Sequence, residues 1–439
     1  MMKWIQIEPS GPLTGTVRIQ GSKNSSLALL AAACMTGEPV TLTGIPNILD
    51  IRVIEDIVSS IGVRMERGPD GSITVDASRI HNARLDIAKT SAYRASYYFI
   101  GALLARTRAV TIGYPGGDNF VSRPIDQHIK ALKALGAGFE FFQDHYEVTA
   151  GKLSGSVIFF DTITSGATIN AMLAAVLAQG RTELRNAARD PEVVDTANLL
   201  NKMGARIIGA GTDHIRIEGV SELHGCSYAV IPDRLIAGAF LMAAGITGGR
   251  ITVEDVIPEH LNSCLAKLKE TGLGLEIGDS SITAYGGEHL RAVRVRTGMY
   301  PLFATDLQQP LTSMLLMAQG RSIVTDKVYP ERFNHVAQLK RMGARIEVRG
   351  GSAFIQGGHT LKGSHVHASD VRAGTSLLLA GLAAEGSTYI SGVEHIERGY
   401  EDAIGLFRTL GAKITLLQGE LAPGNEGHSA VSPVLLQGS

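Results

Sequence analysis

A short pattern recurs six times along this chain of 439 residues, at intervals of about 70 residues. In each copy a bulky residue and a glycine stand between an amphipathic stretch and a stretch of strand character. The glycines are Gly62, Gly136, Gly204, Gly272, Gly343 and Gly411. Glycine is expected just past the end of a helix, where the backbone needs a positive φ angle. The pattern therefore predicts six copies of one supersecondary unit.

A second pattern precedes each glycine and concerns apolar helices. The first example is the run Ser25 to Ala33, which contains mostly Leu and Ala and follows the polar head Gly21 to Asn24. A helix without a polar face has to be buried. Strands such as residues 214–218 alternate polar and apolar side chains and so have one wet face. Each unit thus reads buried helix, strand, amphipathic helix, strand, strand, which predicts an α/β fold with helices inside and sheets outside.

Six such units exceed one hydrophobic core and suit two domains of three repeats each. We expect the first domain at residues 23–230 and the second at residues 231–420. Residues 1–22 hold two short strands that could close the second domain. Residues 423–439 are rich in Gly, Pro and Ser and have no periodicity, so we predict a disordered tail there.

Composition excludes several classes of protein. The net charge of −1 argues against sequence-independent binding of nucleic acid. Three cysteines at no metal-like spacing (Cys34, Cys226 and Cys264) fit a reducing compartment and predict neither a disulfide framework nor a metal site. The first residues do not resemble a signal peptide, and the longest apolar run, residues 235–246, is too short for a bilayer. We therefore expect a soluble cytoplasmic protein with no membrane partner.

The starts of the six apolar helices carry charged or small polar residues: Lys23 with Asn24, Arg94, Thr164 to Gly166, Asp233 with Arg234, Asp306, and Asp370 with Arg372. The three aspartates can be explained as N-caps. Cations oppose the helix dipole at an N-terminus, so capping does not explain the lysine and the arginines. An anion between them would. We expect a polar cleft with a cationic lining that suits a substrate carrying several phosphates.

Two other segments stand out. Residues 113–126 form a long Gly-rich link, which is typical of a lid but also of a plain surface turn.

Arg332 and Arg398 occupy equivalent places in the fifth and sixth units, where a single arginine would be a solvated charge. We interpret the nearby His335 and His395 as structural. The sequence contains no Walker A, His-Glu-x-x-His or dinucleotide-binding motif.

Several longer motifs carry a resemblance to a known family. They are Gly-Ser-Lys-Asn, Arg-Pro-Ile-Asp, Asn-Ala-Ala-Arg-Asp-Pro-Glu-Val-Val-Asp, Pro-Asp-Arg, Thr-Asp-Leu-Gln, Glu-Arg-Phe-x-His-Val, Asp-Val-Arg-Ala and His-Ile-x-Arg-Gly-Tyr. With them the chain resembles the enolpyruvyl transferases from about residue 3 to 418, and most closely the branch that acts on UDP-N-acetylglucosamine in peptidoglycan precursor synthesis. The resemblance implies two inside-out (inverse) α/β barrel domains of three repeated units each, in agreement with the repeats.

The resemblance also implies a reaction. The family moves the enolpyruvyl group of phosphoenolpyruvate to the 3′-hydroxyl of the sugar and releases phosphate, by addition and elimination through a tetrahedral ketal. The two partners would be phosphoenolpyruvate and UDP-N-acetylglucosamine, with no organic cofactor and no metal. Fixed cations would ease the departure of phosphate by holding its charge.

Residue roles follow from the same resemblance. Lys23, Arg123 and Arg398 would hold the phosphate of phosphoenolpyruvate, with Asn24 also in that site, while Arg332 and Arg372 would face its carboxylate or hold a closed state. Asp306 would take the hydroxyl proton and Asp370 would assist proton transfer at the methylene carbon. The nucleotide-sugar site would be lined by Asn24, Arg94, Arg123, Pro124, Ile125, Asp126, Thr164, Ser165, Gly166, Asp306 and Val328.

One departure concerns the lid, where Asp118 replaces the cysteine that is usual in the family. An aspartate can act as the general acid if burial raises its pKa from about 3.9 toward neutrality. Our hypothesis is that closure of the lid supplies this burial. Because fosfomycin targets the cysteine thiol in this family, we expect the protein to be insensitive to the drug.

Other departures concern the acceptor: Thr162 stands in place of a basic residue, Asp190 and Ile236 in place of glutamates, and Tyr98 in place of a tryptophan. They keep two alternatives open. One is enolpyruvyl transfer to another nucleotide or nucleoside in secondary metabolism. The other is a catalytically silent paralogue that binds a nucleotide sugar. The presence of Lys23, Arg123, Asp306 and Arg398 favours an active enzyme.

Overall fold

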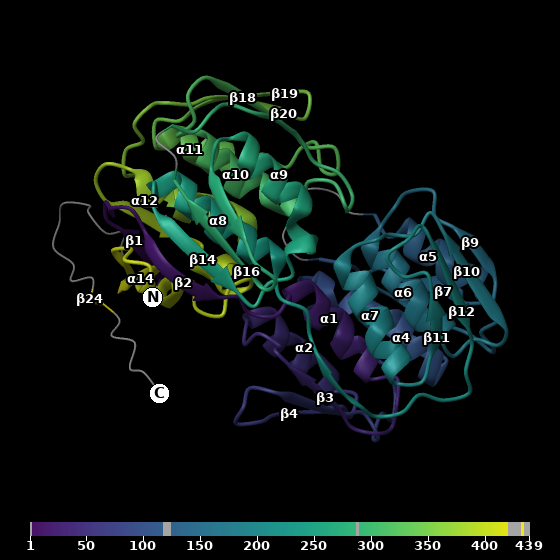
Figure 1. The fold of residues 1–439 in the computed structure, drawn as a ribbon. Helices are drawn as coiled ribbons and strands as arrows, with labels where there is room; N and C mark the ends of the chain where they lie inside the picture. The colour runs from purple at the N-terminus through teal and green to yellow at the C-terminus, as the bar shows by residue number, and fades with distance from the viewer. Residues whose placement is uncertain (1, 117–123, 287–288, 420–431, 434–439) are drawn as a thin grey trace. The chain divides into compact units, whose positions relative to one another are not determined.

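The computed structural model describes residues 2–116, 124–286, 289–419 and 432–433 (Figure 1). The described chain divides into two compact units, residues 20–232 and residues 1–19 with 233–439, which we call the N-terminal and the C-terminal unit. Each unit has a hydrophobic core of its own. The chain therefore passes from one unit to the other twice, at residues 19–20 and 232–233.

Three apolar helices form the core of the N-terminal unit: α1 (Lys23–Ala33), α4 (Tyr98–Thr107) and α6 (Ser165–Ala175). The helix α4 packs against both of the others. Nearly every residue of α1 and α6 is buried, as the lack of a polar face predicted. Three amphipathic helices bury only one side: α2 (Leu49–Ser59), α5 (Asp126–Ala134) and α7 (Pro191–Lys202). The short helices α3 (Ile87–Ala92) and η1 (Arg94–Tyr97) lead into α4.

Three sheets complete this unit, in the strand orders β13-β3-β5-β4, β6-β8-β7 and β11-β12-β10-β9. The central strands of these sheets alternate buried residues with more exposed ones, so one face of each sheet is turned to solvent. The strands are β3 (Val40–Thr43), β4 (Arg64–Arg67), β5 (Ile73–Asp76), β6 (Ala109–Gly113), β7 (Gly138–Phe141), β8 (His145–Thr149), β9 (Val157–Phe159), β10 (Arg181–Arg185), β11 (Arg206–Ile208), β12 (His214–Glu218) and β13 (Ser227–Ala229).

The C-terminal unit repeats the plan. Its buried helices are α8 (Arg234–Thr247), α10 (Gln308–Leu315) and α12 (Val371–Ala383), which pack against one another in all three pairs. Its other helices are α9 (Asn262–Glu270), α11 (Asn334–Arg341), α13 (Val393–Glu397), α14 (Ala403–Thr409) and the short η2 (Pro258–Leu261) and η3 (Thr305–Leu307). No helix in the described part of the chain is long and apolar enough to cross a bilayer.

The sheets of the C-terminal unit have the orders β15-β16-β14-β2, β17-β18-β20-β19 and β21-β22-β1-β23-β24. Their strands are β1 (Met2–Ile7), β2 (Thr14–Arg18), β14 (Arg250–Glu254), β15 (Gly274–Ile277), β16 (Ser281–Tyr285), β17 (Arg294–Arg296), β18 (Arg321–Thr325), β19 (Arg345–Arg349), β20 (Ser352–Gln356), β21 (His365–His367), β22 (Thr388–Ser391), β23 (Ile414–Gly419) and β24 (Ser432–Pro433). Antiparallel ladders dominate, and a parallel pair joins the edge strand in five of the six sheets.

The six repeat glycines behave as predicted. Each follows a helix, and their φ angles lie between 88° and 106°. In the third, fifth and sixth repeats an additional strand, which the sequence patterns did not predict, precedes the buried helix. It pairs in parallel with the strand that follows the helix, as β9 does with β10 and β17 with β18. The sheets are therefore mixed.

At the two passages between the units, the strand before the buried helix pairs with a strand of the other unit's first repeat. The strand β2 precedes α1 but pairs with β14 of the C-terminal unit, while β13 precedes α8 but pairs with β3 of the N-terminal unit. The sixth sheet is completed by β1, which lies between β22 and β23 in antiparallel register with both. The N-terminal segment thus belongs to the C-terminal unit, next to the strands that end the last repeat (Figure 1).

Candidate functional site

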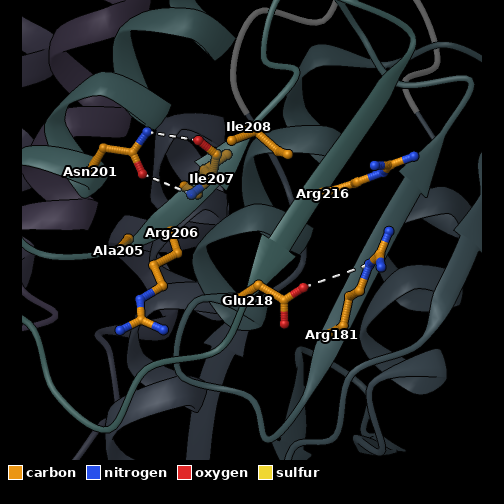
Figure 2. A pocket seen from close by; sticks show the side chains of 8 residues that line it. All are labelled: Arg181, Asn201, Ala205, Arg206, Ile207, Ile208, Arg216 and Glu218. Carbon is orange, nitrogen blue, oxygen red and sulfur yellow. Dashed lines mark hydrogen bonds and ion pairs between the residues drawn. The ribbon is translucent and has the colours of Figure 1, made fainter.

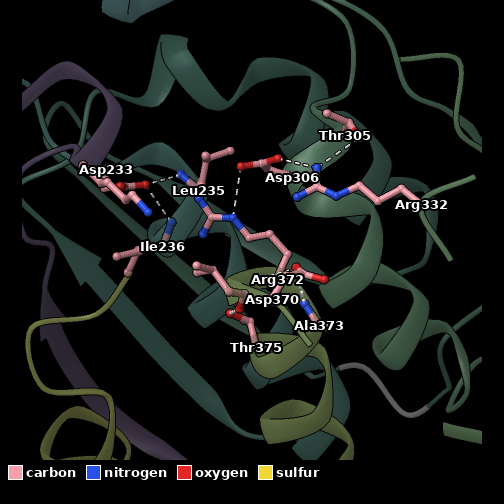
Figure 3. Close-up of polar contacts among 12 residues, drawn as sticks. Asp233, Leu235, Ile236, Thr305, Asp306, Arg332, Asp370, Arg372, Ala373 and Thr375 are labelled. Carbon is pink, nitrogen blue, oxygen red and sulfur yellow. Dashed lines mark hydrogen bonds and ion pairs between the residues drawn. The ribbon is translucent and has the colours of Figure 1, made fainter. Parts of the chain in front are cut away.

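The clearest polar cluster in the C-terminal unit surrounds Asp306, in the short helix η3 that leads into α10 (Figure 3). Its Oδ1 lies 2.6 Å from Nη1 of Arg332, and its Oδ2 lies 3.1 Å from Nε of Arg372. The two arginine side chains are only 4% and 7% exposed, whereas the carboxylate is 27% exposed. Both oxygens of one partly accessible carboxylate are thus engaged by two buried guanidinium groups.

The charges of this triad are strongly coupled. Burial alone would raise the pKa of Asp306, but the two arginines outweigh it and hold the pKa well below its ordinary value. Burial alone would lower the pKa of Arg372, but Asp306 and Asp233 outweigh it and raise the pKa. The carboxylate is therefore ionised at neutral pH. The two guanidinium groups form a site for an anion, and Asp306 occupies it.

Two of the three aspartates at the helix starts are N-caps. Oδ1 of Asp233 accepts hydrogen bonds from the N–H groups of Leu235 (2.9 Å) and Ile236 (3.1 Å). Oδ1 of Asp370 accepts them from Arg372 (2.9 Å) and Ala373 (3.0 Å). The capping interpretation is wrong for Asp306, because the chain enters α10 through the short helix η3 and the carboxylate faces the arginines instead.

A buried carboxylate that the sequence did not single out supports this cluster. Asp326, 1% exposed, follows β18 and accepts hydrogen bonds from Thr305 Oγ1 (2.7 Å) and from the N–H groups of Val328 (2.9 Å) and Tyr329 (2.8 Å). It thereby fixes the predicted site residue Val328 in a turn. Arg332 Nη1 also lies 3.4 Å from Thr305 Oγ1. One sequence feature could have indicated Asp326, namely its place directly after a strand of β-branched residues.

Arg398, the remaining arginine predicted for this unit, follows α13 and is half-buried. Arg234 begins α8, and its guanidinium lies 5.3 Å from the centre of the Tyr300 ring. Arg234 therefore has a cation–π contact with Tyr300 that does not depend on a bound anion.

In the N-terminal unit, Lys23 begins α1 and its Nζ lies 2.6 Å from Oδ2 of Asp50 on α2. The side chains are 13% and 2% exposed, so this is a largely buried ion pair. Asp50 supplies the counter-charge that the lysine needs at a helix N-terminus. Sequence reasoning missed it, because a single aspartate in an amphipathic helix looks like a surface residue. Asn24 is half-buried beside the lysine.

The predicted nucleotide-sugar residues lie partly together. Thr164 caps α6, accepting the N–H of Ala167 at 3.5 Å, and Ser165 Oγ donates to Asp190 Oδ2 at 2.8 Å. Gly166 packs so closely on α5 that a Cβ there would lie 3.3 Å from the ring of His128. The start of α6 is thus adjacent to the first turn of α5.

The first turn of α5 follows Pro124 and Ile125 and begins with Asp126, whose Oδ2 accepts a hydrogen bond from Gln127 at 2.7 Å. Arg94 opens η1, and its guanidinium lies 5.8 Å from the centre of the Tyr97 ring. The predicted residues Asp118 and Arg123 lie outside the described residues.

A cavity of about 440 Å³ lies elsewhere on the N-terminal unit, against the sheet of β10, β11 and β12 (Figure 2). Its lining contains none of the predicted site residues and consists of Arg181, Asn201, Ala205, Arg206, Ile207, Ile208, Arg216 and Glu218. The Asn201 side chain hydrogen-bonds both the N–H and the C=O of Ile207, at 2.8 and 2.9 Å. These backbone groups of the edge strand β11 are therefore not available to pair with another strand.

Comparison with known proteins identifies the family. The model of the family described as EPSP synthase (3-phosphoshikimate 1-carboxyvinyltransferase) matches residues 7–406. This chain belongs to the enolpyruvyl transferase family. Two of its relatives, both described as UDP-N-acetylglucosamine 1-carboxyvinyltransferase 2, come from Bacillus cereus and Bacillus subtilis. They are 47% and 46% identical to it over 413 and 416 residues, covering 94% of this chain and 96% of each relative.

Solved structures agree with this assignment. The enolpyruvyl transferase NikO from Streptomyces tendae has a TM-score of 0.86 and 25% identity, covering 94% of this chain and 99% of that one. An EPSP synthase from Acinetobacter baumannii has a TM-score of 0.73 at 20% identity, covering 95% of this chain and all of that one, which supports the fold alone. The protein is thus an enolpyruvyl (1-carboxyvinyl) transferase with an α/β fold of mixed sheets.

Three of the departures noted in the sequence of this enolpyruvyl transferase occupy different environments. Asp190 bonds Ser165 at the start of α6, so the shorter carboxylate still reaches the predicted nucleotide-sugar residues. Ile236 is 1% exposed and belongs to the core of the C-terminal unit. Thr162 is exposed in the link between β9 and α6. Of the three, Asp190 has a contact that ties it directly to the predicted site.

Proposed function

We propose that this enolpyruvyl transferase moves the enolpyruvyl group of phosphoenolpyruvate to the 3′-hydroxyl of UDP-N-acetylglucosamine and releases phosphate. The observation that carries this proposal is the 46–47% identity, over 94% of the chain, to relatives described as UDP-N-acetylglucosamine 1-carboxyvinyltransferases. The reaction would supply a precursor of peptidoglycan. The cationic side chains at the helix starts are chemically suited to an acceptor and a donor that both carry phosphate.

On this proposal each compact unit is an inside-out α/β barrel domain of three repeats. The burial of α1, α4 and α6 in one unit and of α8, α10 and α12 in the other supports it. So does the repetition of one strand order in the sheets, for example β9-β10-β12-β11 and β17-β18-β20-β19. The first domain would be the N-terminal unit and the second the C-terminal unit.

The binding roles follow from charge and position. Lys23, Arg123 and Arg398 would hold the phosphate of phosphoenolpyruvate, and Arg332 and Arg372 its carboxylate. The nucleotide sugar would lie along the starts of η1, α5 and α6. There the hydroxyl of Thr164 and the backbone N–H groups of a helix start offer donors to phosphate oxygens. Asp370 would assist proton transfer at the methylene carbon.

Asp306 would be the base that takes the proton of the acceptor hydroxyl. In the described arrangement both of its oxygens are engaged by arginines, so it is a weak base. The carboxylate of phosphoenolpyruvate has the same charge and shape as that of Asp306. Its arrival would give the two guanidinium groups a second anion, loosen their hold on Asp306 and raise the pKa of that carboxyl. Substrate binding would thereby free the base for the addition step.

Asp118 would be the general acid, which delivers a proton to the methylene carbon during addition. This assignment rests on the residue's place in the Gly-rich link and on the resemblance described above. Closure over the substrate would raise its pKa by burial.

Release of phosphate from phosphoenolpyruvate tests the proposal. We expect release with UDP-N-acetylglucosamine, and a fall of at least about 10²-fold in Asp306→Asn, because a positioned base contributes that much. Asp279→Asn, which changes an exposed aspartate of the same unit, is the matched control and should keep the wild-type rate. Release only with UMP or another nucleotide would replace the proposed acceptor. No release with any acceptor would refute enolpyruvyl transfer by this chain.

A further inference from the structure

A buried carboxylate on α7 joins two other segments of the N-terminal unit. Asp195, which is 1% exposed, accepts a hydrogen bond from the Tyr228 hydroxyl at 2.6 Å through Oδ1. Its Oδ2 accepts the hydroxyl of Ser25 and, at 3.4 Å, the N–H of Ile231. Ser25 lies in the first turn of α1, Tyr228 in β13, and Ile231 just beyond β13.

These three donors lie where the chain enters and leaves the unit. Ser25 is two residues beyond Lys23, on the segment that arrives from β2. Tyr228 and Ile231 lie on the segment that departs toward α8. The two segments also contact each other directly, because the N–H of Ser22 donates to the carbonyl of Ile231 at 2.7 Å. Asp195 therefore links the incoming and outgoing segments.

The close packing of this region leaves it little freedom. A Cβ on Gly21 would lie 1.9 Å from the carbonyl oxygen of Gly44, so the incoming segment passes against the end of β3 with no room for a side chain. On the other side, the ion pair with Asp50 holds the side chain of Lys23. The start of α1 is thus held by its lysine through Asp50 and by its first turn through Asp195.

A stable core does not require such a carboxylate. Burial raises the pKa of Asp195, and a buried charge is tolerated only when hydrogen bonds compensate its lost hydration. An apolar residue of similar size packs at no such cost. What the carboxylate adds is direction, because its three hydrogen bonds constrain the geometry of two different segments, one through Ser25 and the other through Tyr228 and Ile231.

We infer that Asp195 is a positioning residue for the reaction, because it holds Ser25, and with it Lys23 and Asn24, in a fixed relation to the departing segment at Tyr228 and Ile231. The inference rests on the proposed function, in which Lys23 holds the phosphate of phosphoenolpyruvate. Asp195 acts through Ser25 and touches no reacting atom in this scheme.

The test compares two adjacent buried serines of α1. Ser25→Ala removes the bond to Asp195, whereas Ser26→Ala removes a hydroxyl that donates to the carbonyl of Ser22 within the same helix at 2.7 Å. We expect kcat/KM for phosphoenolpyruvate to fall about tenfold in Ser25→Ala and in Asp195→Asn, since small misplacements of a binding group have effects of up to 10²-fold. Ser26→Ala should stay within about twofold of wild type, with a similar change in thermal stability to Ser25→Ala.

Amide hydrogen exchange supplies a second readout that does not depend on activity. In Ser25→Ala the N–H groups of Ser22 and Ile231 should exchange at least about fivefold faster than in Ser26→Ala, because the link between the two segments is weakened. Wild type that releases no phosphate refutes the proposed function, and exchange alone then decides whether Asp195 links the segments. Active wild type with equal rates in the two serine variants overturns the inference, and so does faster exchange without loss of kcat/KM.

Discussion

Replacing Arg332 by methionine tests whether the Asp306 triad has the energetics that its geometry implies. The substitution keeps most of the apolar stem and removes the guanidinium whose Nη1 lies 2.6 Å from Asp306 Oδ1. Arg332 is 4% exposed, so water does not take the place of the guanidinium that the substitution removes. Asp306 keeps Arg372 as a partner at 3.1 Å and is 27% exposed, so water compensates part of the loss.

The expected magnitude follows from these contacts. Breaking a fully buried ion pair costs roughly 3–5 kcal/mol of stability. The cost should be smaller here, because Asp306 keeps its ion pair with Arg372 and some contact with water. We expect Arg332→Met to lower the free energy of unfolding of the C-terminal unit by about 2–3 kcal/mol at pH 7. The matched control is Arg349→Met in the same unit, where the arginine is 72% exposed and pairs with Glu347. Such an exposed pair contributes about 0–1 kcal/mol.

The pH dependence gives the prediction a second, independent part. Because the arginines hold the pKa of Asp306 low, the wild-type stabilisation is fully present above pH ~4. It is lost as pH falls further, since the unfolded chain then takes up the proton first. In Arg332→Met the pKa of Asp306 rises toward its ordinary value. The difference in unfolding free energy between the two proteins should therefore shrink by about 1 kcal/mol between pH 5 and pH 3.

The assay is denaturant unfolding followed by tryptophan fluorescence. Trp4 is the chain's one tryptophan and is 8% exposed in β1, so its emission reports on the C-terminal unit. Urea midpoints and slopes for wild type, Arg332→Met and Arg349→Met at pH 7, 5 and 3 give the required differences. Equal destabilisation by the two substitutions, or a difference that does not change with pH, would refute the reasoning.

Three further outcomes follow. Loss of the α8 cap in Asp233→Ala should destabilise the C-terminal unit by about 1 kcal/mol in the same Trp4 assay, and no change would mean that water replaces the cap. Burial lowers the pKa of His335 to about 3, so its neutral form favours folding above pH ~6.5 and this contribution declines as pH falls toward 3. His335→Leu should flatten that decline, and an unchanged pH profile would contradict it. Finally, Asp118 offers no thiol, so mass spectrometry after fosfomycin treatment should find no covalent adduct at residue 118.

Much of the local structure can be read from the sequence because it depends on near neighbours. The all-round apolar pattern of α1 and α6 requires burial wherever the helices lie, and both are buried. The six repeat glycines need positive φ because each ends a helix, and each has it. Asp233 and Asp370 could be explained as caps from the sequence because the donors of a cap lie two and three residues away in the chain.

The pairing of distant segments could not be read in the same way. The strand β2 joins β14, and β1 joins β22 and β23, although more than 200 residues separate the partners. A three-residue strand such as β9 or β17 has too little pattern to predict. Its hydrogen-bond partner, β10 or β18, comes in the sequence only after a buried helix. The mixed character of the sheets is decided by these contacts.

The same distinction applies to the candidate site. The sequence by itself determined which residue types stand at the helix starts, because the repeats place a polar residue before each apolar helix. Only the tertiary structure decided that Asp306 meets Arg332 and Arg372, residues 26 and 66 positions away. It likewise placed Asp50 against Lys23 and Asp195 against Ser25. A single carboxylate carries no local sign of its partner, because ion pairs and buried hydrogen bonds depend on distances that folding alone sets.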